Sequence, residues 1–180
     1  MSNYCNWRAL CLLTYLWVLP VQADEITAQE YTIKAVFLFN LGSFVTWPPT
    51  TFEHSEAAFN ICVLGRDPFG EVLDAVVAEK TITGHPVAVH RLNAISQAAD
   101  CQQLFVSNSE QANLPAIFEA TYGKPVLVVG DMPDFVLNGG MLQFYPRDNK
   151  IRLMLDPQAF EEAGLKPSAN LMRIAQLVRK

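Results

Sequence analysis

Polar residues follow three predicted buried strands, and their types and positions could bind a small ligand. The apolar runs Ile61–Leu64, Gln103–Val106 and Val126–Val129 are short and rich in β-branched or large apolar residues, which is typical of buried parallel strands. The carboxyl ends of parallel strands meet at one edge of a sheet, where α/β proteins bind ligands. We therefore predict a small-molecule site there, made of Gly65, Asp67, Phe69, Gly70, Ser107, Asn108, Ser109 and Asp131.

The same residues have a simpler explanation as loop and capping residues. Asp67 followed by Pro68 has the pattern of a helix N-cap and a first-turn proline, and Ser107 to Glu110 offers further caps. Glycine, serine and aspartate are common in any loop of an α/β domain. Ordinary loop chemistry therefore remains the alternative to a ligand site.

The sequence contains no motif for catalysis and no metal-ligand spacing. A Gly-x-Ser-x-Gly elbow, a His-Glu-x-x-His pair and a phosphate-binding Walker loop are all missing from it. The histidines are His54, His85 and His90, and the last two would face opposite sides of a strand because their separation is odd. We expect solvated surface histidines, no metal, no cofactor and no enzymatic activity.

The first 23 residues have the pattern of a cleaved secretory signal. Arg8 precedes the apolar run Ala9–Leu19, and the small residue Ala23 ends the segment. The run is too short to span a bilayer, which takes ~20 apolar residues, so cleavage after about Ala23 is favoured over an uncleaved anchor. This leaves one domain, residues 24–180, exported and not inserted in a membrane. Loss of Arg8 changes the formal net charge from −5 to −6, which disfavours nucleic acid and anionic lipid as partners.

Two cysteines remain in the exported part, Cys62 and Cys101. In an exported protein an even number of cysteines favours a disulfide. Cys62 lies in the first of the buried strands and Cys101 just before the second, so both sulfurs would lie at the same end of neighbouring strands. A thiol redox site is the alternative, although Cys-x-x-Cys spacing and an evident basic neighbour are missing.

The order of elements predicts an α/β fold with a mainly parallel sheet, flanking helices and an antiparallel hairpin at its edge, in one Rossmann-like domain. Strands and helices alternate from about residue 59 to 130, including a strand over Val87–Leu92 and a short helix over Asn93–Ala99. A hairpin follows, with strands Met141–Tyr145 and Ile151–Leu155. We then expect a helix from Asp156 to Gly164 and a last helix over Ala169–Val178.

The first helix is predicted over Ala28–Thr46, with a capping box at Thr27–Glu30 and a stop at Trp47 and Pro48. It is apolar on most sides, so it is either packed under the sheet or partly paired with another subunit or partner protein. For the second case we predict an exposed partner-binding surface made of Phe44, Trp47, Pro48, Gly139, Gly140 and Met141.

Several segments, in order along nearly the whole exported chain, resemble the YfiR family of periplasmic proteins. They are Tyr31–Asn40, Trp47-Pro48, Ile61–Gly70, Cys101 before Leu104–Val106, Gly139–Met141 and Gly164–Leu171. The resemblance implies a periplasmic protein that binds the sensor part of an inner-membrane diguanylate cyclase of the YfiN type and holds it inactive. Release of the inhibition would raise cyclic di-GMP and favour biofilm growth.

The resemblance also implies that Cys62 and Cys101 form the disulfide found in the family between neighbouring strands. The hairpin departs from the family pattern, because some members carry a second cysteine pair there and residues 141–156 contain none. A second function, a periplasmic small-molecule binding protein, remains open, and so does a homodimer.

Overall fold

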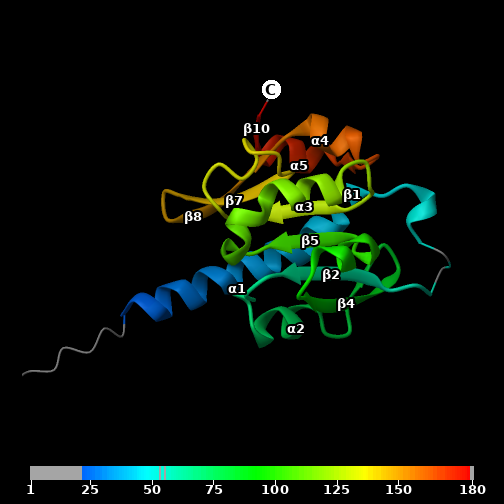
Figure 1. Cartoon of the computed structure of the whole chain (residues 1–180). Helices are drawn as coiled ribbons and strands as arrows, with labels where there is room; N and C mark the ends of the chain where they lie inside the picture. Colours follow the sequence, from blue (N-terminus) through cyan, green and yellow to red (C-terminus); the bar gives the residue numbers. More distant parts are fainter. Residues whose placement is uncertain (1–21, 53, 55, 179–180) are drawn as a thin grey trace, which may run out of the picture.

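A sheet of eight strands forms the centre of the computed structural model, which describes residues 22–52, 54 and 56–178 (Figure 1). The helices are α1 (Gln22–Ser43), α2 (Glu71–Val77), α3 (Leu114–Thr121), α4 (Pro157–Glu162) and α5 (Ala169–Ile174), with short 3-10 helices η1 (Pro49–Thr51), η2 (Ile95–Asp100) and η3 (Asn108–Asn113). The strands are β1 (Val45–Thr46), β2 (Phe59–Leu64), β3 (Thr81–Ile82), β4 (His85–Leu92), β5 (Gln103–Val106), β6 (Leu127–Gly130), β7 (Leu142–Arg147), β8 (Lys150–Leu155), β9 (Lys166–Pro167) and β10 (Gln176–Leu177).

The order of strands across the sheet is β10-β8-β7-β6-β5-β2-β4-β3. The five strands from β4 to β7 in this order are parallel, whereas β8 pairs antiparallel with β7 and β3 pairs antiparallel with β4. The predicted fold class is therefore confirmed. From β2 the chain crosses to β4 on one side and then returns to β5 on the other side, so the direction of winding reverses between β2 and β5. Such a reversal is the topological switch point of an open α/β sheet.

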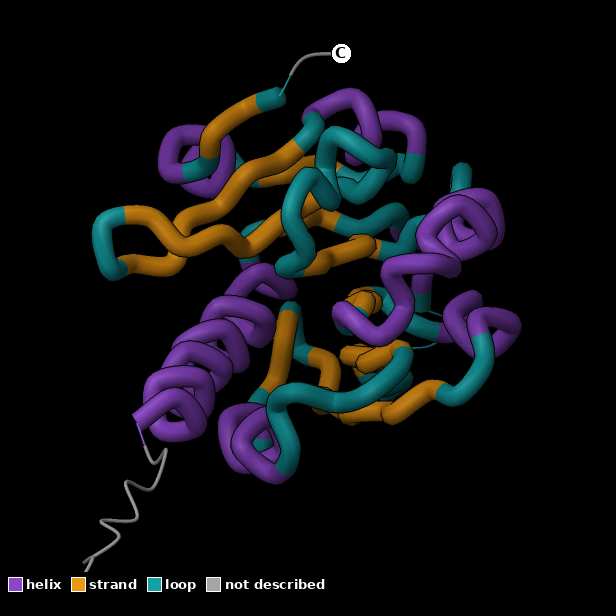
Figure 2. Tube along the Cα trace, turned by 60° about the vertical axis from the view of Figure 1, so that its left-hand side comes forward, coloured by secondary structure: helices purple, strands orange, loops and turns teal. Residues whose placement is uncertain are grey.

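Helices cover both faces of the sheet, with α1 on the opposite face from α3 (Figures 1 and 2). The buried side chains of α1 include Ala35, Leu38 and Leu41. The Gln103 side-chain amide on β5 donates to the Leu38 carbonyl at 2.7 Å, which fixes α1 against the centre of the sheet. Burial of these apolar side chains on both faces makes one continuous core.

The bounds predicted for the first helix are wrong at both ends. Within the described residues α1 begins at Gln22, so the expected capping box at 27–30 lies inside the helix. The helix ends at Ser43 because the next residues form β1, in which Val45 pairs with Pro167 of β9. Ile33 and Val36 on α1 remain exposed, at 43% and 44%.

Three other segments differ from the sequence prediction. The hairpin strands extend to Arg147 and Lys150, because Asp148 and Asn149 both have positive φ (53° and 55°) and make a two-residue turn that matches the strand twist. The short helix expected over Asn93–Ala99 is present as the 3-10 helix η2, but it begins at Ile95 and ends at Asp100. The last helix stops at Ile174, since β10 then pairs parallel with β8 and completes the sheet edge.

No helix within residues 22–52, 54 and 56–178 is both long enough and apolar enough to cross a bilayer. The predicted signal segment falls almost wholly on residues 1–21, which lie outside the described residues.

Candidate functional site

The three loops expected to form a site do come together at the carboxyl ends of β2, β5 and β6. Register places Leu64 beside Val106 and Val106 beside Gly130, so these strands end side by side. The loops that follow hold Gly65 to Gly70, Ser107 to Ser109 and Asp131. Whether they bind a ligand stays a prediction, but their placement follows from the parallel register.

A cavity of about 350 Å³ opens between the loops after β2 and β5, at the switch point. It is lined by Tyr31, Arg66, Asp67, Pro68, Ser107, Asn108 and Ser109. Gly65 has φ +87°, and an added Cβ there would overlap the Ser109 hydroxyl, so only glycine fits. That hydroxyl accepts a hydrogen bond from the Arg66 backbone N–H at 2.8 Å, which joins the two loops that form the cavity walls.

Gly65, Phe69 and Gly70, although predicted as ligand residues, are not among the residues that line this cavity. The Phe69 ring is buried and packs edge-on against Tyr31 and Phe105, with centroid separations of 5.6 and 4.7 Å. Phe69 therefore attaches the loop to the core. Gly70 supplies its carbonyl to Arg91 at 2.8 Å and has a positive φ of 53°.

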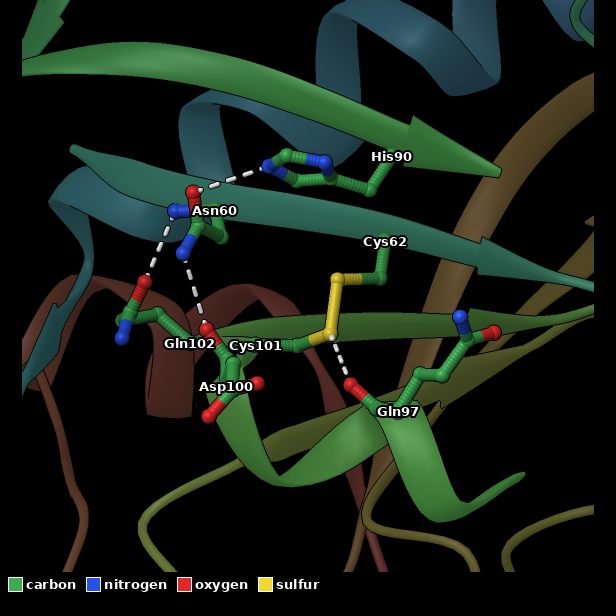
Figure 3. Close-up of a disulfide and its surroundings, with 7 residues drawn as sticks. All are labelled: Asn60, Cys62, His90, Gln97, Asp100, Cys101 and Gln102. Carbon is green, nitrogen blue, oxygen red and sulfur yellow. Dashed lines mark hydrogen bonds between the residues drawn. A yellow bond between two sulfur atoms is a disulfide. The ribbon is translucent and has the colours of Figure 1, made fainter. Parts of the chain in front are cut away.

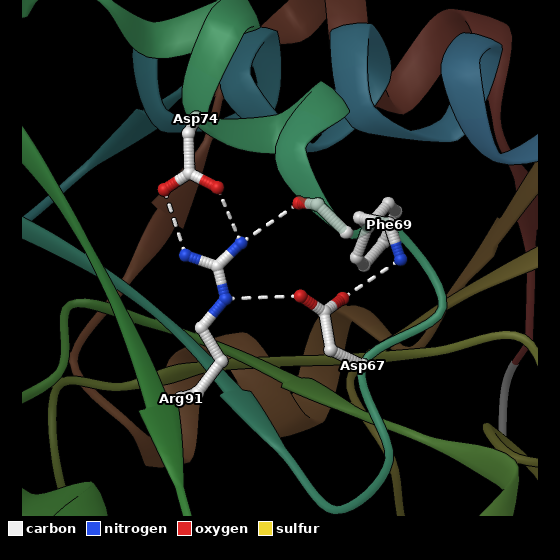
Figure 4. Close-up of polar contacts among 5 residues, drawn as sticks. Asp67, Phe69, Asp74 and Arg91 are labelled. Carbon is white, nitrogen blue, oxygen red and sulfur yellow. Dashed lines mark hydrogen bonds and ion pairs between the residues drawn. The ribbon is translucent and has the colours of Figure 1, made fainter.

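Asp67 is held by a cluster of charges centred on Arg91 of β4 (Figure 4). One Asp67 oxygen accepts from the Phe69 N–H at 2.7 Å and the other accepts from Arg91 Nε at 2.9 Å. Arg91 also makes a bidentate pair with Asp74 at 2.7 and 2.6 Å. Hydrogen bonding from Arg91 holds the pKa of the Asp74 carboxyl below its usual value, and hydrogen bonding to Asp74 raises the pKa of Arg91. The cluster fixes the loop after β2.

Asp131, at the end of β6, is paired with α1 and does not line the cavity. Its side chain is 2% exposed and lies 2.6 Å from Lys34 Nζ, and Lys34 in turn pairs with Glu30 at 2.6 Å. The same Asp131 oxygen, Oδ2, accepts from the Tyr31 hydroxyl at 2.8 Å. Burial, and then the negative charge of Asp131, raises the pKa of Tyr31, so its hydroxyl stays protonated as the donor. The other oxygen, Oδ1, has no hydrogen-bond partner among the described residues.

The opposite end of the β2–β5 pair carries the disulfide between Cys62 and Cys101 (Figure 3). Beside it the Asn60 N–H donates to Gln102 Oε1 at 2.7 Å, and the Gln102 N–H donates back to the Asn60 carbonyl at 3.1 Å. The Asn60 side chain donates to the Asp100 carbonyl at 2.9 Å. The amino ends of β2 and β5 are thus joined covalently and by hydrogen bonds.

The partner-binding residues expected on the surface are mostly not exposed. Trp47 is 8% exposed and packs edge-on against Phe59 at a centroid distance of 5.0 Å, so the prediction of an exposed indole is wrong. Gly140 and Met141 are buried as well, because Gly140 packs against the Phe135 ring. Of the remaining positions, Phe44 and Pro48 are half-buried and Gly139 is exposed.

The expectation of solvated histidines is wrong for His85. Its ring stacks on Phe52 with centroids 3.8 Å apart, and its Nδ1 lies 2.7 Å from the Ala57 carbonyl. In the part of the chain that the structure describes, no group of three or more histidine, cysteine, aspartate or glutamate side chains could hold a metal ion.

Sequence reasoning missed Tyr31, Lys34 and Arg66. The first two come from α1, far from the strand loops along the chain, and no pattern within the loops indicates them. Lys34 carried one signal, since it is the only charged residue between Tyr31 and Phe52 and yet the helix around it is apolar. Arg66 lies between the predicted residues Gly65 and Asp67 but was not part of the predicted site.

The fold and the strand-end cavity define the chain as an open-sheet α/β domain with a switch point between β2 and β5. The chain belongs to the YfiR/HmsC-like family, whose model matches residues 31–176. Membership supports a regulatory, periplasmic protein and is consistent with a non-enzyme. A comparison with curated proteins gave no match.

Two solved structures share the fold at low sequence identity. One is described as an ABC domain in complex with L-Trp from Streptococcus pneumonia, with a TM-score of 0.55 and 10% identity over 80% of this chain. The other is a conserved domain protein from Vibrio cholerae, with a TM-score of 0.52 and 11% identity over 85% of this chain. The chain spans 60% of each of those chains. At these identities the likeness shows the fold alone.

Proposed function

We propose that this protein is a periplasmic regulator that binds the periplasmic sensor part of an inner-membrane diguanylate cyclase and inhibits it. By this action it would control cyclic di-GMP and biofilm formation. Family membership over residues 31–176 is the observation that supports the proposal most directly.

The partner would bind along α1, where the structure leaves apolar side chains uncovered. Ile33 and Val36 are three residues apart and therefore lie on the same side of the helix. A groove of about 620 Å³ runs beside Ile33, between α1 and the β7–β8 hairpin. It is lined by Gln29, Glu30, Ile33, Phe37, Pro146, Asn149, Lys150 and Ile151. Exposed apolar side chains beside a groove are typical of protein interaction sites.

This surface replaces the one centred on Trp47, because the indole is buried against Phe59. Phe44, Pro48 and Gly139 remain secondary candidates, and none of them lines the groove beside Ile33. Pro48 lies against Gly164, just after α4, and α4 residues line a second groove of about 560 Å³ that includes Gly139.

The test is a pull-down of the purified protein with the periplasmic domain of each diguanylate cyclase from the same cell. Cyclic di-GMP is measured in the deletion strain complemented with each variant. We expect the variant Ile33→Asp/Val36→Asp to lose cyclase binding and leave cyclic di-GMP high. The matched control is Val72→Asp, which places a charge at an exposed apolar position of α2.

Unchanged cyclic di-GMP on deletion, with no cyclase retained, would refute the proposal. If the α1 double variant and the Val72 control bind the cyclase equally well, the cyclase remains the partner but its binding site does not lie on α1. A homodimer through the same face would appear as a change in molar mass with the α1 variant, and light scattering measures it.

A further inference from the structure

The cavity at the switch point is large enough for a small organic molecule and lies where α/β sheets bind their ligands. Its volume of about 350 Å³ is within the range of ligand pockets, roughly 300–1,000 Å³. Its walls come from three separate parts of the chain: the loop after β2, the loop after β5, and Tyr31 on α1. The rings of Tyr31 and Pro68 give it apolar surface, and the remaining lining residues are polar.

Ser107 lines this cavity, and its hydroxyl has no hydrogen-bond partner among the described residues. The residue is 5% exposed and occupies the N-cap position of η3, yet its side chain makes no capping hydrogen bond. Serine at such a position usually bonds to a backbone N–H of the first turn. Ser168 does so before α5, where its Oγ accepts from the Leu171 N–H at 3.2 Å. The Ser107 hydroxyl is therefore available to a molecule in the cavity.

Arg66 is the cation of the cavity, and it has no counterion among the described residues. Asp67, the one acid in the lining, is neutralised by Arg91 at 2.9 Å. Three further acids lie close by but outside the lining. Glu30 and Asp131 both pair with Lys34, and Glu110 accepts from the Asn113 side chain at 2.8 Å. Among the residues that line the cavity, the one charge without an oppositely charged partner in the described part of the chain is that of Arg66.

We propose that this cavity binds a small organic anion, whose carboxylate or phosphate group contacts the Arg66 guanidinium and the Ser107 hydroxyl. Its apolar body lies against the rings of Tyr31 and Pro68, and the Asn108 amide supplies a further hydrogen bond at the mouth. Charge-assisted hydrogen bonds from arginine and hydroxyl groups recognise both kinds of anion. The site does not depend on the proposed cyclase partner, since none of its residues belongs to the exposed face of Ile33 and Val36.

The test uses nuclear magnetic resonance of the ¹⁵N-labelled, purified protein titrated with phenylacetate, with phenyl phosphate and with benzyl alcohol. We expect saturable shifts confined to amides of residues 65–67, 69 and 107–109 with one or both anions, and none with the uncharged alcohol. The ratio of the two affinities identifies carboxylate or phosphate as the preferred group. Arg66→Gln should weaken binding of that anion by about tenfold or more.

Arg147→Gln is the matched control, because it removes the same charge from an exposed arginine on the hairpin. Asn108→Trp fills the mouth from an exposed position and should abolish the shifts while the remaining spectrum is unchanged. The proposal is overturned if neither anion gives saturable shifts at these amides. It is equally overturned if benzyl alcohol binds as well as the anions, or if the Arg66 and Arg147 variants bind alike.

Discussion

The two ends of the β2–β5 pair are built in opposite ways. At the amino end, Cys62 and Cys101 are bonded, and Asn60 and Gln102 exchange hydrogen bonds (Figure 3). At the carboxyl end the same two strands separate into loops that enclose a cavity, where Ser107 and Arg66 have no partner for their side chains among the described residues.

The difference shows how one pair of strands can be rigid at one end and form a candidate binding site at the other. Joining the amino ends fixes the register of β2 and β5, and the register determines where their loops begin. The loop after β2 is then held from the side by Arg91, which contacts Asp67, Asp74 and Gly70 (Figure 4). Tyr31, Asp67 and Ser109 line the cavity and are paired with neighbouring groups, which holds the loops in place. The Ser107 hydroxyl and the Arg66 guanidinium also line it and have no such partner among the described residues. Preorganised loops with spare polar groups are typical of binding sites.

Removing the disulfide should have the largest effect on stability. Cys62→Ser/Cys101→Ser opens a closed loop with a sequence separation of 39 residues and should lower the free energy of unfolding by roughly 4 kcal/mol in the chain-entropy model. Urea denaturation followed by circular dichroism measures this loss. Reduction of the unaltered protein should give the same shift, and a loss below about 1 kcal/mol would show that the amino end does not depend on its covalent bond.

Breaking the hydrogen bonds of the amino end should have the next largest effect. Gln102→Ala leaves the Asn60 N–H without its acceptor at 2.7 Å, which should cost about 1–2 kcal/mol of unfolding free energy. Gln97→Ala is the control, because that side chain is exposed in the neighbouring η2. Equal stability of the two variants in urea would mean that water replaces the lost contact at no cost.

At the carboxyl end, the Arg91 cluster should give a small, acid-sensitive contribution. The pKa of Asp74 is lowered by Arg91, so its contribution is full above the ordinary carboxyl pKa and is lost as pH falls through the lowered value. Because Asp74 is half exposed, we expect less than about 1 kcal/mol. The stability of Asp74→Asn should decline less between pH 5 and pH 2 than that of the unaltered protein.

Glu71→Gln is the matched control for this acid titration, since Glu71 is exposed in the same first turn of α2. Thermal melts across the pH series compare the three proteins. If the stability of all three proteins declines equally with falling pH, the ion pair between Arg91 and Asp74 does not contribute to the acid sensitivity.

Truncation of the unpaired hydroxyl should have the smallest effect. Ser107→Ala removes a group without a hydrogen bond, so unfolding free energy should change by less than about 0.5 kcal/mol. Ser168→Ala removes a capping bond at 3.2 Å and should cost about 1 kcal/mol. Equal costs in parallel urea titrations would contradict the assignment of Ser107 as a spare group.

The strands of the core were predictable, because each is a short apolar run whose burial on both faces needs no distant information. The exact ends of several helices and strands were not predictable. Asp148 and Asn149 form the hairpin turn with positive φ at both positions, and the end of α5 depends on pairing of β10 with β8. The burial of Trp47 could not be predicted, because a large aromatic residue beside prolines suits a core and an interface equally well.

The candidate site was predictable only as far as strand topology determines it. Parallel strands place Asp67, Ser107 and Asp131 at one edge, whatever their side chains do there. Their different roles follow from contacts with other elements. Arg91 on β4 forms an ion pair with Asp67, and Lys34 on α1 forms one with Asp131. Long-range pairing of this kind leaves no local pattern in a sequence.

The Cys62–Cys101 bond also encloses one whole edge of the sheet. The chain visits α2, β3, β4 and η2 between the two cysteines, so these elements form a covalent ring attached to the two central strands. When this edge opens locally, both of its ends stay tethered, and it recloses without a search by a free chain. Amide hydrogens of β4 should therefore exchange through brief openings confined to the ring. In the reduced protein we expect the same opening to extend to β2 and β5, because the covalent link between the two strands is gone.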